Sequence, residues 1–199
     1  MIKSKEFENY ESYVTAQKRR AVRGKKCTKS KYNDFVKVAK SLKKQFPQYQ
    51  NVLCIGSRHP SEIKAFNEEG FTAVGIDLIK SDGMIECDMS KIPEHDFFKD
   101  KKMDILFCSH SLEHCLDFEG FIKGVEYLGT KVIMVLCPLR ESYSEWDCTI
   151  YDFMKPSGEI TKEDILKYFT GFELLDMDVK KHRRKNRGSI TFTLKRSIA

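Results

Sequence analysis

The sequence predicts a doubly wound α/β fold with a mostly parallel sheet of about seven strands and a C-terminal antiparallel hairpin. Two observations predict it. Short apolar runs alternate with helical segments between residues 50 and 140, which is typical of parallel βαβ units. Only a short polar, basic stretch separates the last two strand-like segments, whereas a parallel pair needs a crossover of roughly a dozen residues or more. The final pair must therefore be antiparallel.

The predicted elements follow from the spacing of apolar residues. Apolar positions recur with a helical period from Tyr32 to Phe46, and Pro47 marks the end of this helix. The buried strand Asn51–Ile55 comes next and ends at Gly56. The elements predicted after it are a helix over 60–66, strands over 71–78, 84–87 and 103–108, a helix over 117–128 and a strand over 131–139.

The C-terminal part departs from this alternation. Thr161 and Asp164 have the spacing of a capping box, so we expect a helix to begin there, to run to Thr170 and to end at Gly171. Strands are predicted over 172–179 and 189–195. Five parallel βα units followed by an antiparallel hairpin form an unusual order of elements, which narrows the range of folds.

Length and composition indicate one soluble domain. The 199 residues fit a basic N-terminal arm over 1–30 and a single domain over 31–199. The longest apolar run, 132–137, is far shorter than the roughly 20 residues of a membrane span, and the first residues carry no secretory signal. The seven cysteines include no C-x-x-C pair, and several lie in apolar runs. We expect a reduced, cytoplasmic protein that does not bind membranes.

The positive charge is concentrated in two segments. Residues 1–50 hold fourteen Lys and Arg against four Asp and Glu, a net charge of +10. Residues 180–187 carry six bases and no acid. This distribution favours an anionic partner, although a solvated surface would have the same composition.

Candidate ligand-binding residues follow the predicted strands. Ligands of doubly wound sheets bind at the carboxyl ends of the parallel strands. Gly56 ends the first strand and lets the backbone approach a ligand, and Asp77 ends the second, where it could accept hydrogen bonds from a ribose. The interval between them is the roughly 20 residues expected of a nucleotide-binding turn and its ribose-binding acid. Asp88 and Met89 follow the third strand and suit an adenine.

The loop after the first strand is not built for phosphates. It is not a Walker loop, and Arg58 and Pro60 stand where the dinucleotide fingerprint has its later glycines. A nicotinamide-dependent oxidoreductase is therefore disfavoured. An adenosine without phosphates fits this loop better.

The segments V-L-C-I-G-S-R-H-P-S-E, V-G-I-D-L, I-E-C-D-M and D-I-L-F-C-S-H-S-L-E-H resemble the consecutive motifs of class I (Rossmann-like) S-adenosylmethionine-dependent methyltransferases. The likeness covers about residues 50–140, and the terminal hairpin extends it. It implies a small enzyme that uses S-adenosylmethionine as cofactor, with Gly56 at the methionine part, Asp77 at the ribose, Asp88 and Met89 at the adenine, and His110 beneath the donor. The full set of expected cofactor-binding residues is Cys54, Gly56, Ser57, Arg58, Asp77, Leu78, Asp88, Met89, Ser109 and His110.

The segment after the fourth strand supplies the catalytic candidates. A hydroxyl acceptor needs a general base within hydrogen-bonding reach, and His110, Glu113 and His114 are the candidates. For His114 a structural hydrogen bond is the favoured alternative. We expect no metal, because no third ligand is apparent in the sequence and H-S-L-E-H is not the order of a zinc peptidase motif.

The acceptor is expected on the side of the fifth strand. The stretch 140–159 is interpreted as an acceptor-binding lid, although its aromatic residues could instead pack on the sheet. With the basic loop 180–187 above the site, we expect methyl transfer to an O or N of an anionic acceptor: a nucleic acid, a glycan or a phosphorylated small molecule. The expected acceptor-binding residues are Arg140, Trp146, Tyr151, Arg183 and Arg184.

One alternative from another class stays open. The resembling family usually has an acid at the position of Cys54 and glycines at those of Arg58 and Pro60. The altered loop therefore also fits a nucleic-acid-binding protein that keeps the fold and transfers no methyl group.

Overall fold

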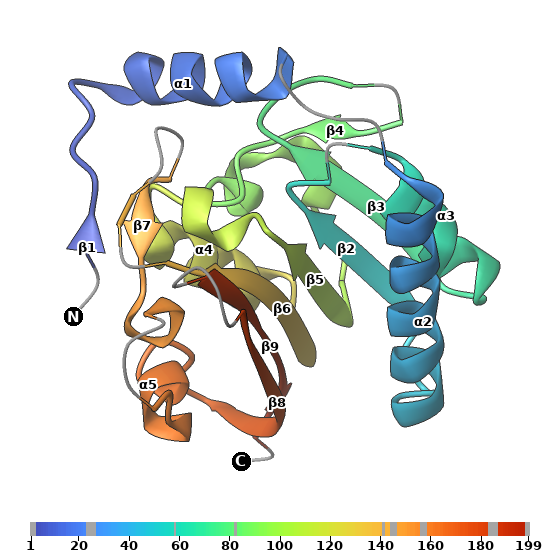
Figure 1. Cartoon of the computed structure of the whole chain (residues 1–199). Coiled ribbons are helices and arrows are strands. Elements are labelled where there is room, and N and C mark those ends of the chain that lie inside the picture. The colour runs from blue at the N-terminus through green and yellow to red at the C-terminus, as the bar shows by residue number, and fades with distance from the viewer. Residues whose placement is uncertain are drawn as a thin grey trace.

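The computed structural model describes residues 3–22, 27–57, 59–81, 83–140, 142–143, 147–155, 159–182 and 187–197. Its main feature is a seven-stranded sheet in the order β4-β3-β2-β5-β6-β9-β8 (Figure 1). The bounds in chain order are β2 Asn51–Ile55, β3 Thr72–Asp77, β4 Ile85–Glu86, β5 Ile105–Ser109, β6 Val132–Leu139, β8 Phe172–His182 and β9 Arg187–Arg196.

The directions of the strands confirm the predicted topology. The strands β4, β3, β2, β5 and β6 pair in parallel, whereas β9 pairs antiparallel with both β6 and β8. The hairpin strands are longer than predicted, because β8 continues to His182 and β9 begins at Arg187. Of the segment expected as a basic loop over 180–187, residues 180–182 and 187 are strand, and residues 183–186 lie outside the described part.

The alternation of side chains along the central strands produces two cores, one on each face of the sheet. Val52 and Cys54 of β2 pack with α2 (Lys29–Gln45) and α3 (Ser61–Glu68) on one face. Leu53 and Ile55 of the same strand belong to the other core, which contains residues of α4 (Phe118–Tyr127). Because neighbouring residues of a strand point to opposite faces, β2 is apolar throughout and is covered on both sides.

Side-chain caps fix the starts of three helices. Thr28 caps α2, which begins three residues before the first helical position that the sequence predicts, and Asp117 caps α4. Thr161 and Asp164 form the predicted capping box of α5 (Lys162–Leu166), although this helix is shorter than expected. The 3₁₀ helices are η1 Ile92–Glu94, η2 Asp96–Phe98, η3 Leu112–His114 and η4 Asp152–Met154.

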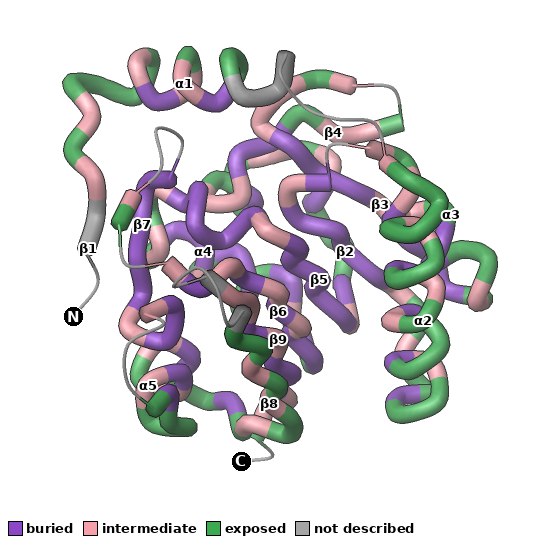
Figure 2. The backbone as a smooth tube through the Cα atoms, viewed as in Figure 1, coloured by how far each residue is buried: buried purple, intermediate pink, exposed green. Residues whose placement is uncertain are grey.

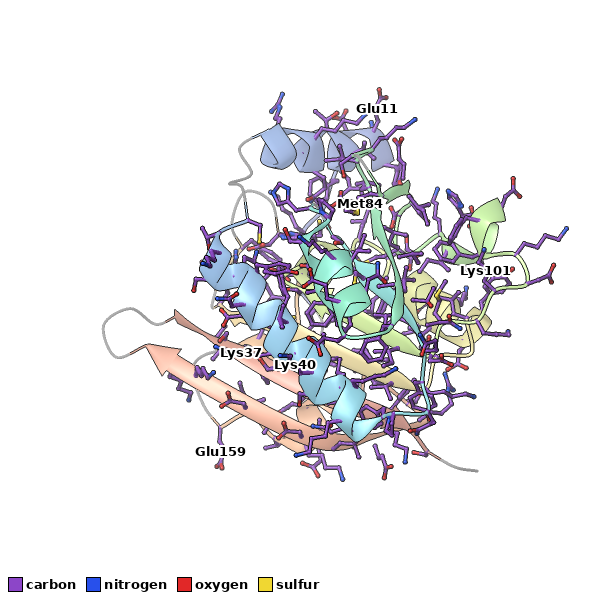
Figure 3. All side chains as sticks on the ribbon, turned by 90° about the vertical axis from the view of Figure 1, so that its right-hand side faces the viewer. Glu11, Lys37, Lys40, Met84, Lys101 and Glu159 are labelled. Carbon is purple, nitrogen blue, oxygen red and sulfur yellow. The ribbon has the colours of Figure 1, made fainter. Side chains whose placement is uncertain are left out.

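The N-terminal segment is packed against the sheet. Lys3–Ser4 forms β1, which pairs antiparallel with β7 (Thr149–Ile150). The helix α1 (Tyr10–Val22) then crosses above the carboxyl ends of the parallel strands (Figure 1). Its inner side is buried and its outer side is exposed (Figure 2), and Glu11 on the outer side points away from the body (Figure 3). None of the described helices is both long and apolar enough to cross a membrane.

Candidate functional site

A cavity lies between α1 and the carboxyl ends of β2, β3 and β5. Leu78 lines this cavity and also a neighbouring one toward β4, so the two cavities adjoin beneath α1; together they are called the slot. The inner part is lined by Tyr13, Gln17, Gly56, Asp77, Leu78, Met89, Ser111 and His114. The outer part is lined by Tyr10, Val14, Lys18, Leu78, Glu86, Cys87, Asp88, Lys91, Glu94 and His95. The slot thus brings together the residues that the sequence places at three separate strand ends.

Gly56 makes the sharp turn at the end of β2. Its φ of +67° lies in the left-handed region, which favours glycine. A Cβ at this position would lie 2.5 Å from Cβ of Ser111, so no side chain fits between the two segments. The amide of Ser57 donates to the carbonyl of Ile76 (3.0 Å), which ties the turn to β3. The backbone therefore borders the slot directly at this point.

Two carboxylates mark the slot at the next strand ends. Asp77 is 6% exposed, and its Oδ1 accepts the amide of Ile79 at 3.0 Å. Asp88 is 9% exposed, and its Oδ1 accepts the amide and the hydroxyl of Ser90 at 2.9 and 2.8 Å. These hydrogen bonds fix one oxygen of each carboxylate. They orient both groups toward the slot before any ligand arrives.

The helix α1 supplies residues that were not identified as site residues from the sequence. The hydroxyl of Tyr10 donates to Oδ2 of Asp88 (2.8 Å), and that of Tyr13 donates to the carbonyl of His114 (3.1 Å). Burial, followed by the bond to Asp88, raises the pKa of Tyr10. Gln17, one turn further on, is 4% exposed and lines the same slot. The positions 10, 13, 14 and 17 have helical spacing, and this is the signal that could have revealed the contact.

Some expected binding residues lie beneath the slot. Cys54 and Ser57 are fully buried, and Ser109 is 8% exposed; none of the three lines the cavity. Arg58 lies outside the described residues. A buried acid also lies near the turn that follows β2: Glu62, in the first turn of α3, is 8% exposed. Burial raises the pKa of Glu62 to about 7, and a hydrogen bond from Ser57 partly opposes this effect.

His110 follows β5 in an uncommon conformation. Its φ is +53°, and its amide donates to the carbonyl of Leu136 at 2.8 Å. The left-handed region is sparsely populated by residues other than glycine, and residues held there are concentrated at functional sites. The side chain is half-buried at the carboxyl edge of the sheet.

Glu113 and His114 meet a residue that was not predicted as part of the site. Asp147, just before β7, is 1% exposed, and its Oδ1 lies 3.6 Å from Nδ1 of His114. Oε1 of Glu113 lies 3.6 Å from Nε2 of the same ring. The guanidinium of Arg140 donates to Oδ2 of Asp147. Tertiary contacts thus assemble two carboxylates, an imidazole and a guanidinium from two distant segments.

The acceptor-binding expectation needs correction for Tyr151. Its ring is fully buried, stacks on Phe153 at 5.1 Å, and its hydroxyl donates to the carbonyl of Leu112 (3.2 Å). The described residues 147–154 are all buried or nearly so, because β7 pairs with β1 and η4 packs into the core, so this part is not a lid. Arg140 stays at the carboxyl end of β6. Trp146, Arg183 and Arg184 lie outside the described residues.

Several solved structures with the same fold are methyltransferases. No protein-family model and no curated protein matches the sequence. The 1,6-didemethyltoxoflavin-N1-methyltransferase of Burkholderia thailandensis, crystallised with S-adenosylhomocysteine, superposes with a TM-score of 0.63 at 12% identity, over 99% of this chain and 95% of that one. The magnesium protoporphyrin IX methyltransferase of Synechocystis PCC 6803 gives 0.57 at 13%, over 91% and 90%. An S-adenosylmethionine-dependent methyltransferase of Clostridium acetobutylicum gives 0.57 at 13%, over 94% and 98%.

Proposed function

We propose that this chain, which has the fold of class I methyltransferases, transfers a methyl group from S-adenosylmethionine to an acceptor. One observation carries the proposal. Gly56, Asp77 and Asp88 stand at three successive strand ends and border one slot beneath α1. In this order they would meet the methionine part, the ribose and the adenine of one extended ligand.

The chemistry of the slot fits a cationic adenosine derivative better than a nucleotide. Asp77, Asp88, Glu86 and Glu94 line the slot, against two lysines among its lining residues. Carboxylates repel phosphates and attract a positive sulfonium. When bound, S-adenosylmethionine supplies an electrophilic methyl group on sulfur.

The residues of the chain would contribute mainly by positioning. Holding nucleophile and methyl group about 3–3.5 Å apart in line provides most of the rate enhancement available to such a displacement. His110, at the end of β5, is the proposed general base that takes a proton from a hydroxyl or an amine of the acceptor. His114 lines the slot, with the buried Glu113 beside its ring, and the two are proposed to orient the acceptor.

The acceptor is proposed to be anionic. The hairpin strand β8 runs parallel to β6, so it ends at the carboxyl edge of the sheet, and Gly188 of β9 pairs with Leu139 next to Arg140. Lys180 and Lys181, which pair with Ser189 and Gly188, would therefore lie near the acceptor side. A nucleic acid, a glycan or a phosphorylated small molecule would each satisfy them.

S-adenosylhomocysteine is expected to stabilise the protein against heat. At about 100 times its dissociation constant a ligand that binds only the folded state contributes about 2.7 kcal/mol, which shifts the melting temperature by several degrees. Differential scanning fluorimetry measures the shift, with NADH as the control ligand. No shift with millimolar S-adenosylhomocysteine, or a shift with NADH alone, would contradict the proposal.

Tyr10→Phe is expected to strengthen the binding of S-adenosylhomocysteine. In the free protein the Tyr10 hydroxyl holds Oδ2 of Asp88, which the proposal assigns to the adenine. Phe keeps the ring and removes this competing hydrogen bond, which is worth about 1 kcal/mol or roughly fivefold in affinity. Calorimetric titration of both proteins gives the ratio. Weaker binding in the variant would mean that Tyr10 itself binds the ligand.

A further inference from the structure

The cluster formed by Glu113, His114 and Asp147 has the composition of a metal site. Glu113 and His114 belong to η3, and Asp147 precedes β7. One ligand atom from each residue lies within 4.8 Å of the other two. In a tetrahedral zinc site with bonds of about 2.0–2.2 Å to nitrogen and oxygen, the ligand atoms lie roughly 3.4 Å apart. The three side chains would therefore have to draw closer together to share one ion.

The backbone holds these residues together independently of their side chains. The amide of Cys148 donates to the carbonyl of Glu113 at 2.9 Å, and the hydroxyl of Thr149 donates to the carbonyl of Cys115 at 2.5 Å. Residue 147 is thus tied to the segment that carries Glu113 and His114. Preorganised ligands of this kind lose little conformational entropy when an ion binds.

Burial makes the location favourable for a cation. Glu113 and Asp147 are each 1% exposed, and His114 is 6% exposed. Two carboxylates at low dielectric interact strongly with a divalent charge, because little water screens them. Arg140 donates to Oδ2 of Asp147, whereas His114 lies nearest to Oδ1 of the same carboxylate. A guanidinium in that place orients the ligand oxygen as an outer-shell partner.

We propose that Glu113, His114 and Asp147 bind one divalent transition-metal ion, of the Zn²⁺ or Mn²⁺ class. One imidazole nitrogen with two carboxylate oxygens suits these ions better than Ca²⁺, which takes six to eight oxygen ligands. Three protein ligands leave at least one coordination position open. The sequence did not indicate this site because its third ligand is supplied by a distant segment.

The position of the site suggests what the open coordination position would bind. His114 lines the same slot as Gly56 and Asp77, so the ion would lie where the proposed donor meets its acceptor. A metal there would hold an oxygen of the acceptor and lower its pKa. This role rests on the proposed function, whereas the binding of the ion does not.

Titration of the chelator-treated 199-residue chain with MnCl₂ and with ZnCl₂ tests the proposal. We expect one ion per chain by calorimetry and by elemental analysis after gel filtration. Glu113→Gln and Asp147→Asn each remove one ligand charge and are expected to weaken binding at least 30-fold. Glu119→Gln, an exposed acid at the start of α4, is the matched control and should bind as the unmodified chain does.

The outcomes separate the metal site from the methyltransferase proposal. No binding by the unmodified chain at millimolar metal would overturn the site, and so would binding by both ligand variants that is as tight as that of the unmodified chain. Circular dichroism identifies a variant that fails to fold, and the other ligand variant then decides. Stoichiometric metal binding together with no thermal shift by S-adenosylhomocysteine would support the site while contradicting the donor assignment.

Discussion

Asp77→Asn is expected to weaken the binding of S-adenosylhomocysteine about 100-fold, because a charge-assisted pair of hydrogen bonds to a ribose is worth about 3 kcal/mol. The Asn carbonyl can still accept the amide of Ile79, which Oδ1 of Asp77 accepts at 3.0 Å. The turn after β3 should therefore keep its shape. Calorimetric titration gives the affinity, and the melting shift that the ligand produces in the unmodified protein should disappear.

The matched control for this prediction is Asp34→Asn. Asp34 is an exposed acid of α2, and its Oδ1 lies 3.4 Å from Nζ of Lys37. This change alters the net charge by the same amount and leaves the slot untouched, so donor affinity should not change. Equal affinities in the two variants would place the donor away from Asp77 and remove the main support for the enzyme assignment.

Glu62→Gln is expected to remove a marked pH dependence of stability. Burial raises the pKa of Glu62 from 4.5 to about 7 in the folded protein. Between these values the unfolded chain releases a proton that the folded chain keeps, so the free energy of unfolding falls as the pH rises from about 4.5 to about 7. A difference of this size corresponds to about 3 kcal/mol. Above about pH 7 the Glu62 carboxyl is ionised in both states, so its contribution to the free energy of unfolding no longer changes with pH.

Urea unfolding of both proteins between pH 4.5 and 8 measures this effect. The Gln side chain has nearly the same shape and no charge, so the variant should gain stability relative to the unmodified protein as the pH rises. Taking the difference between the two proteins cancels the other titrating groups. Parallel stability curves would show that the Glu62 carboxyl titrates in its ordinary range.

The local pattern of the sequence predicted most of the sheet. The strand Asn51–Ile55 was predicted at its observed bounds, and the antiparallel hairpin followed from the short connection between its strands. The capping box at Thr161 was also predicted. These features depend on neighbouring residues, whose spacing is directly visible in the chain. Gly56, Asp77 and Asp88 could be placed on one edge because parallel strands all end at the same edge.

The tertiary structure decided which distant segments complete the site. The helical spacing in α1 marks the face of the helix that is buried, but it does not say that this face covers the slot or that Tyr10 reaches Asp88. No local pattern indicates that Asp147 reaches His114. Tyr151 could equally have faced an acceptor until its ring was found buried on Phe153. Such contacts depend on how whole elements pack, and the apolar pattern of one element does not specify its partner. The sequence by itself therefore determined the sheet and its ligand-binding edge. Packing decided that α1 covers this edge and that Asp147 joins Glu113 and His114 in the buried cluster.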